Sequence, residues 1–488
     1  MTFRRLVLVV AVLGVAAMAV RPAFDSDTWW HLRTGQWIIE NGRAPQQDPF
    51  SSTMRGSPWQ DPGWLAQVVM LGFFHLGGLA GLTLFTALLV GAAFLLLWPL
   101  LDGPILLRAA LLLLAAATSA VYWAARPYIA SFALAALFLW VLEQWRRGLQ
   151  RRAIWLLPLF MLLWANLHGG FAIGFILLLM YLLGELVSLA SDVLTHRATR
   201  GLAWIGRRRA IGTLSGVLLL CLVGASVNPY GAAILAYPFK TVSIPVLQTY
   251  IQEWQPPDVR SAQLAPFLLM LVLLVVALGV SRRAAAPTEL ITSAGWMVLA
   301  LSAVRHVPVF ALVASPVIAR HISAALAERG GVSTAVDSLG RRTLNTVLGV
   351  VFGLLVIAWT VNQVSAPRLQ AHLRAQIPTG AVEAMRRLEP RGRLLNDYNW
   401  GGYLLWQAYP AYPTFVDGRT DVFSPEVFRD YLRLWAAQPG WAQALDRWQI
   451  GTVLLPPQAP LVEALDHAGW PTVYRDAQAV LMVRPEPG

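Results

Sequence analysis

Long apolar runs recur along most of the chain, and they constrain its fold more than any other feature of the sequence. An apolar helix of about 20 residues crosses the roughly 30 Å hydrocarbon layer of a bilayer. The 488 residues are 57% hydrophobic and only 13% charged, and an ordinary soluble domain has about twice that charge fraction. We therefore predict an α-helical polytopic membrane protein of about eleven spans. The predicted spans are 6–20, 81–101, 105–124, 129–145, 153–165, 171–190, 210–226, 264–280, 288–304, 307–326 and 343–363.

A twelfth apolar stretch, residues 64–74, is shorter than the others and is followed by His75, Gly77 and Gly78. We expect a re-entrant or interfacial helix here. Counting this stretch as a span would break the alternation of charge between successive connections, on which the predicted orientation depends.

Arginines gather in alternate connections between the predicted spans. Short cytoplasmic loops of membrane proteins are enriched in Lys and Arg, so the arginine-rich connections are predicted to be cytoplasmic. The other connections, and everything after Ala366, are then extracytoplasmic. This pattern accounts for the formal net charge of +12 without nucleic-acid binding. The predicted cytoplasmic arginines are Arg4, Arg5, Arg108, Arg146, Arg147, Arg151, Arg152, Arg197, Arg200, Arg207, Arg208, Arg209, Arg282, Arg283, Arg329, Arg341 and Arg342.

The N-terminal apolar run leaves one alternative open. Together with Arg4, Arg5 and the small residues around Ala17 and Ala19, it also fits a cleavable signal peptide. The rest of the topology is the same in either case. The single cysteine, Cys221, lies inside an apolar run, so the sequence has no disulfide framework.

The chain after residue 365 lacks the long apolar runs of the preceding part. We therefore predict two domains, a membrane domain 1–365 and a small extracytoplasmic α/β domain 366–488. Short β-branched runs alternate there with helical stretches at 425–437 and 461–468. Asp417-Gly418-Arg419 reads either as a turn with a structural Asp–Arg pair or as part of a lid over a membrane site. The predicted strands are 392–395, 414–417, 451–455, 471–474 and 480–483.

Two acids, Asp25 and Asp27, directly follow the first predicted span. They could cap the helix that starts there, since Asp is favoured at helix N-termini. They could also act as a general base and a metal ligand, and the two roles are compatible. His31 follows Asp27 by four residues, so the two would lie on one helix face and could share a proton or a metal.

Further polar residues lie at the predicted extracytoplasmic ends of other spans. Each has a purely structural explanation, such as an arginine that snorkels to the interface or a tight turn. Together they suggest a binding or catalytic site, because ionisable groups near membrane depth cost free energy. Arginine could bind a phosphate through two oxygens while a carboxylate accepts a proton from an incoming hydroxyl. The catalytic candidates are Asp25 and Asp27, and the substrate-binding candidates are His31, Arg126, Asn166, His168, Lys240, Glu253, Arg305 and His306.

This layout resembles the GT-C superfamily of integral membrane glycosyltransferases. The resemblance rests on Asp25-Ser26-Asp27 with Trp29-Trp30-His31 after the first span, on ARP, NLHGGF, NPYG, EW and RHVPVF, and on the C-terminal NDYNWGGYLLW and FVDGRTDVF. It covers nearly the whole chain and is similar to a broad group of bacterial members.

The resemblance implies a polyprenyl-phosphate sugar as donor and a lipid, glycan or protein as acceptor. It also implies a bacterial inner-membrane location with the C-terminal domain outside. No WWD motif is present in that domain, which argues against transfer to asparagine. Members differ in metal dependence, so a divalent cation at Asp25 and Asp27 is left open, and no other cofactor is expected.

Two other classes of function remain open at this stage. A secondary transporter would place ionisable residues near the bilayer midplane and often carries an internal repeat, which the sequence does not show. A glycan polymerase or ligase, or a non-catalytic membrane scaffold, could use the same outer arginines without Asp25 and Asp27, because a fold does not fix a function.

Overall fold

The computed structural model describes all residues except 23, 196–201, 245–248, 250, 329–338 and 486–488. Three predicted cytoplasmic arginines, Arg197, Arg200 and Arg329, therefore lie outside the described residues. The chain divides into two compact units. The first contains Met1–Ala23, Thr83–Pro238 and Ile251–Val364, and the second contains Phe24–Leu82, Phe239–Tyr250 and Ser365–Gly488. The second unit thus takes in the first outer loop besides the region after residue 365.

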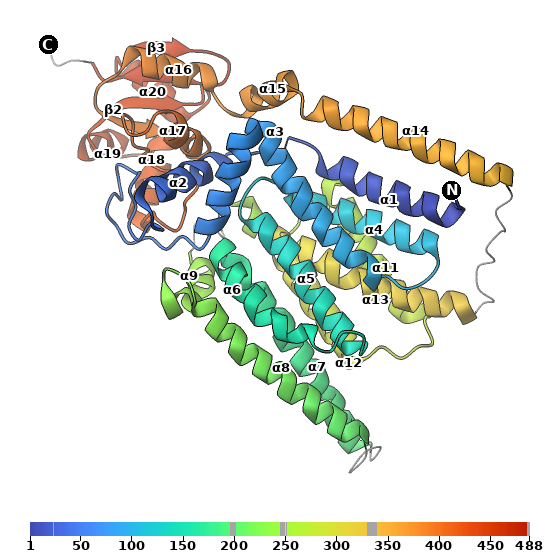
Figure 1. The fold of residues 1–488 in the computed structure, drawn as a ribbon. Coiled ribbons are helices and arrows are strands. Elements are labelled where there is room, and N and C mark those ends of the chain that lie inside the picture. Colours follow the sequence, from blue (N-terminus) through green and yellow to red (C-terminus); the bar gives the residue numbers. More distant parts are fainter. Residues whose placement is uncertain (23, 196–201, 245–248, 250, 329–338, 486–488) are drawn as a thin grey trace. The chain divides into compact units, whose positions relative to one another are not determined.

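Each predicted span coincides with a helix (Figure 1). Eight helices among the described residues are long and apolar enough to cross a membrane. α1, α6 and α12 are shorter, with 17, 11 and 16 residues, so the count of eleven spans stays a prediction. The helices are α1 (Phe3–Ala19), α3 (Trp64–Leu97), α4 (Ile105–Ser119), α5 (Tyr128–Arg146), α6 (Leu157–Leu167), α7 (Ala172–Leu194), α8 (Leu202–Ser226), α11 (Ala265–Val280), α12 (Pro287–Ser302), α13 (Val307–Glu328) and α14 (Leu339–Gln363).

A kink divides α3 into two helical segments. Gly77 and Gly78 have non-helical backbone angles, and Gly78 has φ +56°, a conformation that glycine adopts without steric cost. The break follows the apolar stretch 64–74, which is thus a separate helical segment as predicted. Whether that segment is re-entrant stays a prediction.

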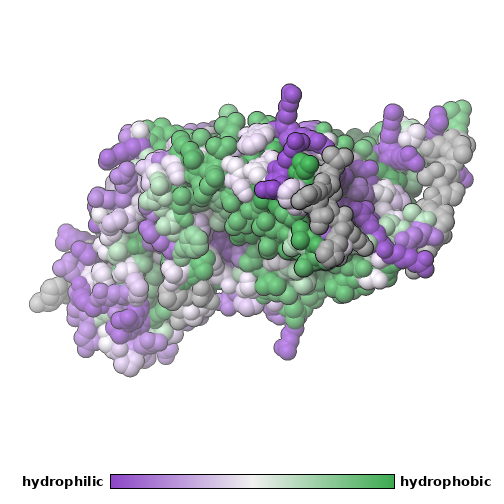
Figure 2. Space-filling view, turned by 90° about the horizontal axis from the view of Figure 1, so that it is seen from below, coloured by the Kyte–Doolittle hydropathy of each residue, from purple (hydrophilic) through white to green (hydrophobic). Residues whose placement is uncertain are grey.

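In the first unit, α13 packs against α4, α11 and α12, while α1 lies between α4 and α14 (Figure 1). α5 and α13 bury most of their side chains, whereas α8 and α14 expose apolar ones such as Leu219, Val223, Leu354 and Leu355. Figure 2 shows hydrophobic side chains over much of the face that it draws. An apolar helix surface left outside a protein core suits lipid contact, so the chain is a multi-pass membrane protein.

The second unit contains a four-stranded sheet in the order β1-β2-β4-β3. β1 (Arg393–Asn396) pairs in parallel with β2 (Ile450–Leu455), and the β2–β4 and β4–β3 pairs are antiparallel. β3 is Thr472–Arg475 and β4 is Val480–Val483. The helices are α2 (Thr28–Asn41), α9 (Tyr237–Val242, at the edge between the units), α15 (Ala366–Gln376), α16 (Thr379–Leu388), α17 (Gly401–Gln407), α18 (Pro425–Trp435), α19 (Trp441–Arg447) and α20 (Pro460–His467).

The strand predicted at 414–417 is absent, and this prediction was wrong. Its backbone groups are bonded elsewhere: Phe415 N–H donates to Asn396 Oδ1 (2.8 Å), and the Thr414 carbonyl accepts from Ser52 N–H (2.8 Å). The Thr53 hydroxyl bonds the Phe415 carbonyl (2.7 Å). A backbone satisfied by side chains and by another loop has no donors or acceptors left for a sheet ladder.

Candidate functional site

Asp25 lies just before α2, whose N-cap residue is Asp27. Its Oδ1 accepts hydrogen bonds from the backbone N–H groups of Asp27 (3.0 Å) and Thr28 (3.2 Å), and the Thr28 hydroxyl lies 3.0 Å from the Asp25 N–H. These reciprocal hydrogen bonds hold the turn that leads into α2. The N-cap residue Asp27 makes no side-chain capping hydrogen bond, and the catalytic roles of Asp25 and Asp27 remain proposals.

The carboxylate of Asp27 lies against the turn formed by residues 417–419. A Cβ added to Gly418 would lie 1.9 Å from Asp27 Oδ1 and 2.9 Å from Trp30 Nε1. At Gly402, a Cβ would lie 2.5 Å from the Ser26 carbonyl oxygen. Both glycines are needed for this close approach, so the acidic loop and the region after residue 365 fit together as one packed surface within the second unit.

His31 bonds to Gln67 on α3. The Gln67 Nε2 lies 3.1 Å from His31 Nδ1, and the His31 ring stacks on Trp30 with ring centroids 3.5 Å apart. An amide nitrogen can only donate, so Gln67 donates to His31 Nδ1. The predicted sharing of a proton or metal with Asp27 stays a prediction.

Gln67 also bonds to Asp61, a residue that the sequence analysis did not select. Asp61 is 4% exposed, and its Oδ1 accepts from the Gly63 N–H (3.0 Å). Burial raises the pKa of Asp61 to about 7, although the Gly63 and Gln67 hydrogen bonds oppose this shift. The sequence signal was weak, since Asp-Pro-Gly reads as an ordinary turn.

Asp417 and Arg419 form the structural pair that the sequence offered as one alternative. Arg419 is fully buried and binds Asp417 through two hydrogen bonds (2.8 and 2.7 Å), and it also binds Asp48 of the first outer loop (2.5 Å). Burial would raise the pKa of Asp48, but Arg419, the Ser51 hydroxyl and the Phe50 N–H together lower it below its usual value. These bonds fasten the outer loop to the turn at residues 417–419.

In the first unit, the structure brings four of the predicted motifs together. Arg126 forms an ion pair with Glu253 (3.0 Å), which lies in the 3-10 turn Gln252–Trp254. Arg305, in the turn Val304–His306, has its guanidinium carbon 4.0 Å from the centroid of Trp254. No carboxylate among the described residues forms an ion pair with Arg305, so its positive charge is less compensated than that of Arg126.

His168 belongs to the same group. Its Nδ1 lies 2.8 Å from Ser131 Oγ and 3.0 Å from the Gly170 nitrogen. Burial, and secondarily the positive charge of Arg305, lowers the pKa of His168 to about 3, so the ring is neutral at physiological pH. Ser131 was not selected from the sequence, because a serine inside an apolar run carries no distinguishing signal.

The remaining candidates have local structural contacts. The Asn166 amide donates to the carbonyls of Leu162 and Val227 (both 2.8 Å) and so connects α6 to the end of α8. His306 Nδ1 bonds the Leu299 carbonyl (2.9 Å) near the end of α12. Lys240, on α9, is exposed, and its side chain has no ion pair among the described residues. Their roles in substrate binding stay predictions.

Comparison with known proteins finds similar folds among solved structures. No family model and no curated protein matches the sequence. The archaeal oligosaccharyltransferase AglB from Archaeoglobus fulgidus, solved with an inhibitory peptide and a dolichol-phosphate, matches with a TM-score of 0.54 and 12% identity over 93% of this chain and 69% of its own. The apo form of an Archaeoglobus fulgidus oligosaccharyltransferase gives a TM-score of 0.50 and 14% identity over 93% of this chain and 69% of its own. The chain has the GT-C fold.

ArnT from Cupriavidus metallidurans bound to undecaprenyl phosphate also matches, with 14% identity, a TM-score of 0.48, and coverage of 98% of this chain and 97% of its own. Identities this low concern the fold alone.

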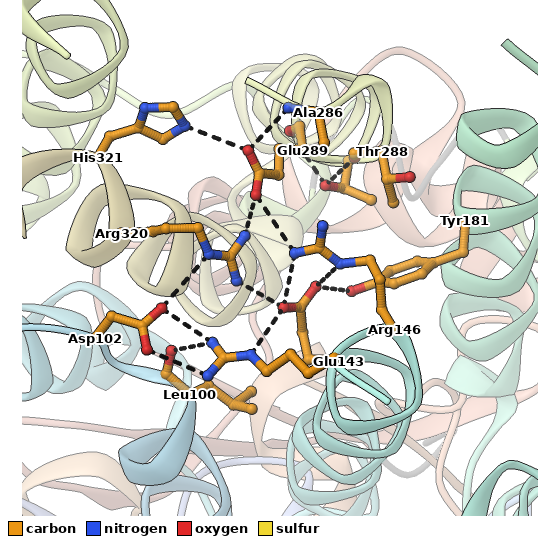
Figure 3. A network of polar contacts seen from close by, with 12 residues as sticks. Leu100, Asp102, Glu143, Arg146, Tyr181, Ala286, Thr288, Glu289, Arg320 and His321 are labelled. Atoms are coloured by element: carbon orange, nitrogen blue, oxygen red, sulfur yellow. Dashed lines mark hydrogen bonds and ion pairs between the residues drawn. The ribbon is translucent and has the colours of Figure 1, made fainter. Parts of the chain in front are cut away.

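A second polar cluster, in the first unit, was missed by the sequence analysis (Figure 3). Glu143 on α5 binds Arg146 through two hydrogen bonds (both 3.0 Å), the Tyr181 hydroxyl (2.7 Å) and Arg320 on α13 (2.8 Å). Arg320 also binds Glu289 on α12. Three arginines and three acids balance in charge, and the cluster joins the ends of spans predicted to be cytoplasmic. We call it the charge cluster: Asp102, Glu143, Arg146, Arg147, Glu289 and Arg320.

The described residues offer no group of three or more His, Cys, Asp or Glu side chains placed to bind a metal ion. Asp25 and Asp27 would supply two carboxylates, and Asp25 Oδ1 already accepts two backbone N–H groups. Mg²⁺ is usually held by one or two carboxylates together with substrate phosphates, so a divalent cation at Asp25 and Asp27 stays a prediction.

Proposed function

We propose that this protein is a membrane glycosyltransferase that moves a sugar from a polyprenyl-phosphate donor to an acceptor at the extracytoplasmic face. The observation that carries the proposal is the GT-C fold, shared with an oligosaccharyltransferase solved with a dolichol-phosphate, on a chain that places Asp25 and Asp27 directly after its first apolar helix. Fold likeness alone does not fix an activity, so the proposal depends on the chemistry of these residues.

The proposed reaction is a displacement at the anomeric carbon. The acceptor hydroxyl oxygen forms a bond to that carbon while the bond from the carbon to the phosphate oxygen breaks. Asp25 or Asp27 accepts the hydroxyl proton as general base. The polyprenyl phosphate leaves with the bonding electrons, and its negative charge is stabilised by cationic and N–H groups.

Arg305 is the strongest candidate for the phosphate. It is half-buried, its guanidinium stacks on Trp254, and no carboxylate among the described residues neutralises it. Arg126, by contrast, is paired with Glu253 at 3.0 Å. We therefore assign Arg305 and His168 to the phosphate, and we assign Arg126 to holding the turn that carries Glu253 and Trp254.

The test is binding and turnover of lipid-linked substrates by the purified full-length protein in nanodiscs. Affinity for a short-chain polyprenyl phosphate should fall roughly 10- to 100-fold in Arg305→Ala, because a hydrogen bond to a charged group contributes about 1.5–3 kcal/mol. Arg305→Lys should also bind more weakly than wild type, since Lys keeps the charge but loses the planar fork.

Arg260→Ala is the matched control, because Arg260 is an exposed arginine in another predicted outer connection, between α8 and α11. Turnover is measured as release of polyprenyl phosphate from a panel of polyprenyl-phosphate hexoses and pentoses, with membrane extract as acceptor. If Arg305→Ala binds like Arg260→Ala, the phosphate assignment fails. If wild type releases no polyprenyl phosphate from any donor, the glycosyltransferase proposal fails.

A further inference from the structure

Three hydrogen-bonded side chains of the helical unit determine where His168 carries its proton. The Trp164 Nε1–H donates to Ser131 Oγ (2.7 Å), and Ser131 Oγ lies 2.8 Å from His168 Nδ1. The Gly170 N–H donates to the same Nδ1 (3.0 Å). Trp164 is fully buried and Ser131 is 4% exposed, so both partners are shielded from water.

The directions of these bonds follow from the groups involved. An indole N–H and a peptide N–H can only donate. Ser131 Oγ therefore accepts from Trp164, and His168 Nδ1 accepts from the Gly170 N–H. Because Nδ1 is an acceptor, the Ser131 hydroxyl donates its hydrogen to it. Two donors then point at Nδ1, and a proton on Nδ1 would face both of them. The ring must be neutral, with its single proton on Nε2.

Gly170 allows this geometry. A Cβ at this position would lie 2.6 Å from Ser131 Oγ and 2.7 Å from His168 Nδ1. Any side chain would therefore separate the peptide N–H from the ring or displace Ser131. The second glycine of the segment NLHGG is thus required by the close approach of its backbone to His168 and Ser131.

The other ring nitrogen is available to a ligand. His168 is only partly buried by surface area, and among the described residues Nε2 has no hydrogen-bond partner. The positive charge of Arg305 acts on the ring and helps to keep it neutral. His168 therefore offers one N–H donor near a cation whose charge is not paired with a carboxylate.

We propose that Ser131 and Trp164 are positioning residues that hold His168 as a neutral Nε2–H donor to an oxygen of a phosphate monoester. The inference rests on the proposed function for the identity of that phosphate as the lipid-linked leaving group. Next to Arg305, a neutral donor binds the oxygen without the repulsion that a second cation would introduce.

The first experiment reads the tautomer directly. The full-length protein, ¹⁵N-labelled on histidine and reconstituted in nanodiscs, is examined by NMR, with His168→Gln used to assign the resonances among the eight histidines. We expect an unprotonated Nδ1 and a protonated Nε2 from pH 5 to pH 8. A short-chain polyprenyl phosphate should shift the Nε2 resonance, while inorganic phosphate at the same concentration should not.

The second experiment tests positioning. Ser131→Ala should weaken binding of the short-chain polyprenyl phosphate roughly 3- to 10-fold, because one hydrogen bond to the ring is lost, and protonated Nδ1 should become detectable. Ser131→Thr, which keeps the hydroxyl, should restore binding. Ser315→Ala is the matched control, because the buried Ser315 hydroxyl bonds the Ala311 carbonyl of its own helix (2.6 Å).

An imidazolium or an Nδ1–H tautomer in wild type would overturn the inference, as would Ser131→Ala binding like Ser315→Ala. An equal Nε2 shift with inorganic phosphate would overturn the assignment to a lipid-linked phosphate. These outcomes differ from a failure of the proposed function. The proposed function fails if wild type does not turn over any donor, whichever tautomer His168 adopts.

Discussion

At the scale of single residues, Asp61 shows how burial changes a carboxyl group in the second unit. The side chain is 4% exposed and is bonded by the Gly63 N–H and the Gln67 amide. Burial raises its pKa from 3.8 to about 7. Gln67 also bonds His31 (3.1 Å), so protonation of Asp61 acts next to one of the predicted substrate-binding residues.

The raised pKa predicts a loss of stability with rising pH. Between about pH 4 and pH 7 the unfolded chain releases the Asp61 proton while the folded protein keeps it, so stability falls across this window. Asp61→Asn does not titrate, so it should be stabilised relative to wild type at pH 8 by up to a few kcal/mol. The two proteins should differ less at pH 5.

The measurement is thermal unfolding of the reconstituted protein at pH 5 and pH 8. Asp466→Asn is the control, because Asp466 is an exposed partner of Arg475. Should wild type and Asp61→Asn show the same change in melting temperature between the two pH values, Asp61 does not have a raised pKa.

At the scale of elements, the charge cluster connects α5, α12 and α13. Arg320 is 5% exposed and binds Glu143 and Glu289, which are 6% and 2% exposed. Removing one partner of a buried ion pair leaves the other charge uncompensated and typically costs 3–5 kcal/mol. We expect Arg320→Met to lower the free energy of unfolding by about that amount.

Arg282→Met provides the control, because Arg282 is exposed in a predicted cytoplasmic connection and its replacement causes the same change in charge. It should change stability by less than about 0.5 kcal/mol. Denaturant titration in detergent micelles gives both values. Equal stability of the two variants would mean that the charge cluster does not hold the helices together.

The helices and most strands could be predicted because their signals are local. Each apolar run became a helix, and four of the five predicted strands were found, as for 451–455 and β2. The strand at 414–417 failed because its backbone bonds Asn396 and the loop around Ser52, partners that are distant in sequence. Asp417–Arg419 was foreseen as a pair, but Asp48 as its third member was not.

The candidate site was predictable only in part, for a similar reason. The structure brings together four residues whose positions at predicted outer ends of spans had suggested a common site: Arg126, Glu253, His168 and Arg305. Three features depend on contacts between segments that are far apart in sequence. They are the ion pair of Arg126 with Glu253, the hydrogen bond of Ser131 with His168, and the charge cluster. Periodicity and composition contain no information about such contacts.

At the scale of the whole molecule, the chain combines the GT-C fold with a second unit that includes its acidic loop. Gly402 and Gly418 allow that loop to pack closely on the region after residue 365. We therefore expect the C-terminal part of the chain to support the proposed catalytic acids directly. The central claim of this account is that one of these acids is the general base for sugar transfer.

The most direct test is sugar transfer from a polyprenyl-phosphate donor by Asp25→Asn and Asp27→Asn. The Asn side chain keeps a carbonyl oxygen that can accept the backbone N–H groups bonded by Asp25, so both variants should express and unfold like wild type. Asp258→Asn is the control, because the exposed Asp258 also accepts a local backbone N–H (3.0 Å). At least one of the two variants should lose transfer by roughly 100-fold or more, as removal of a general base predicts. Near-normal transfer by both would contradict the account and leave Asp25 and Asp27 as structural residues.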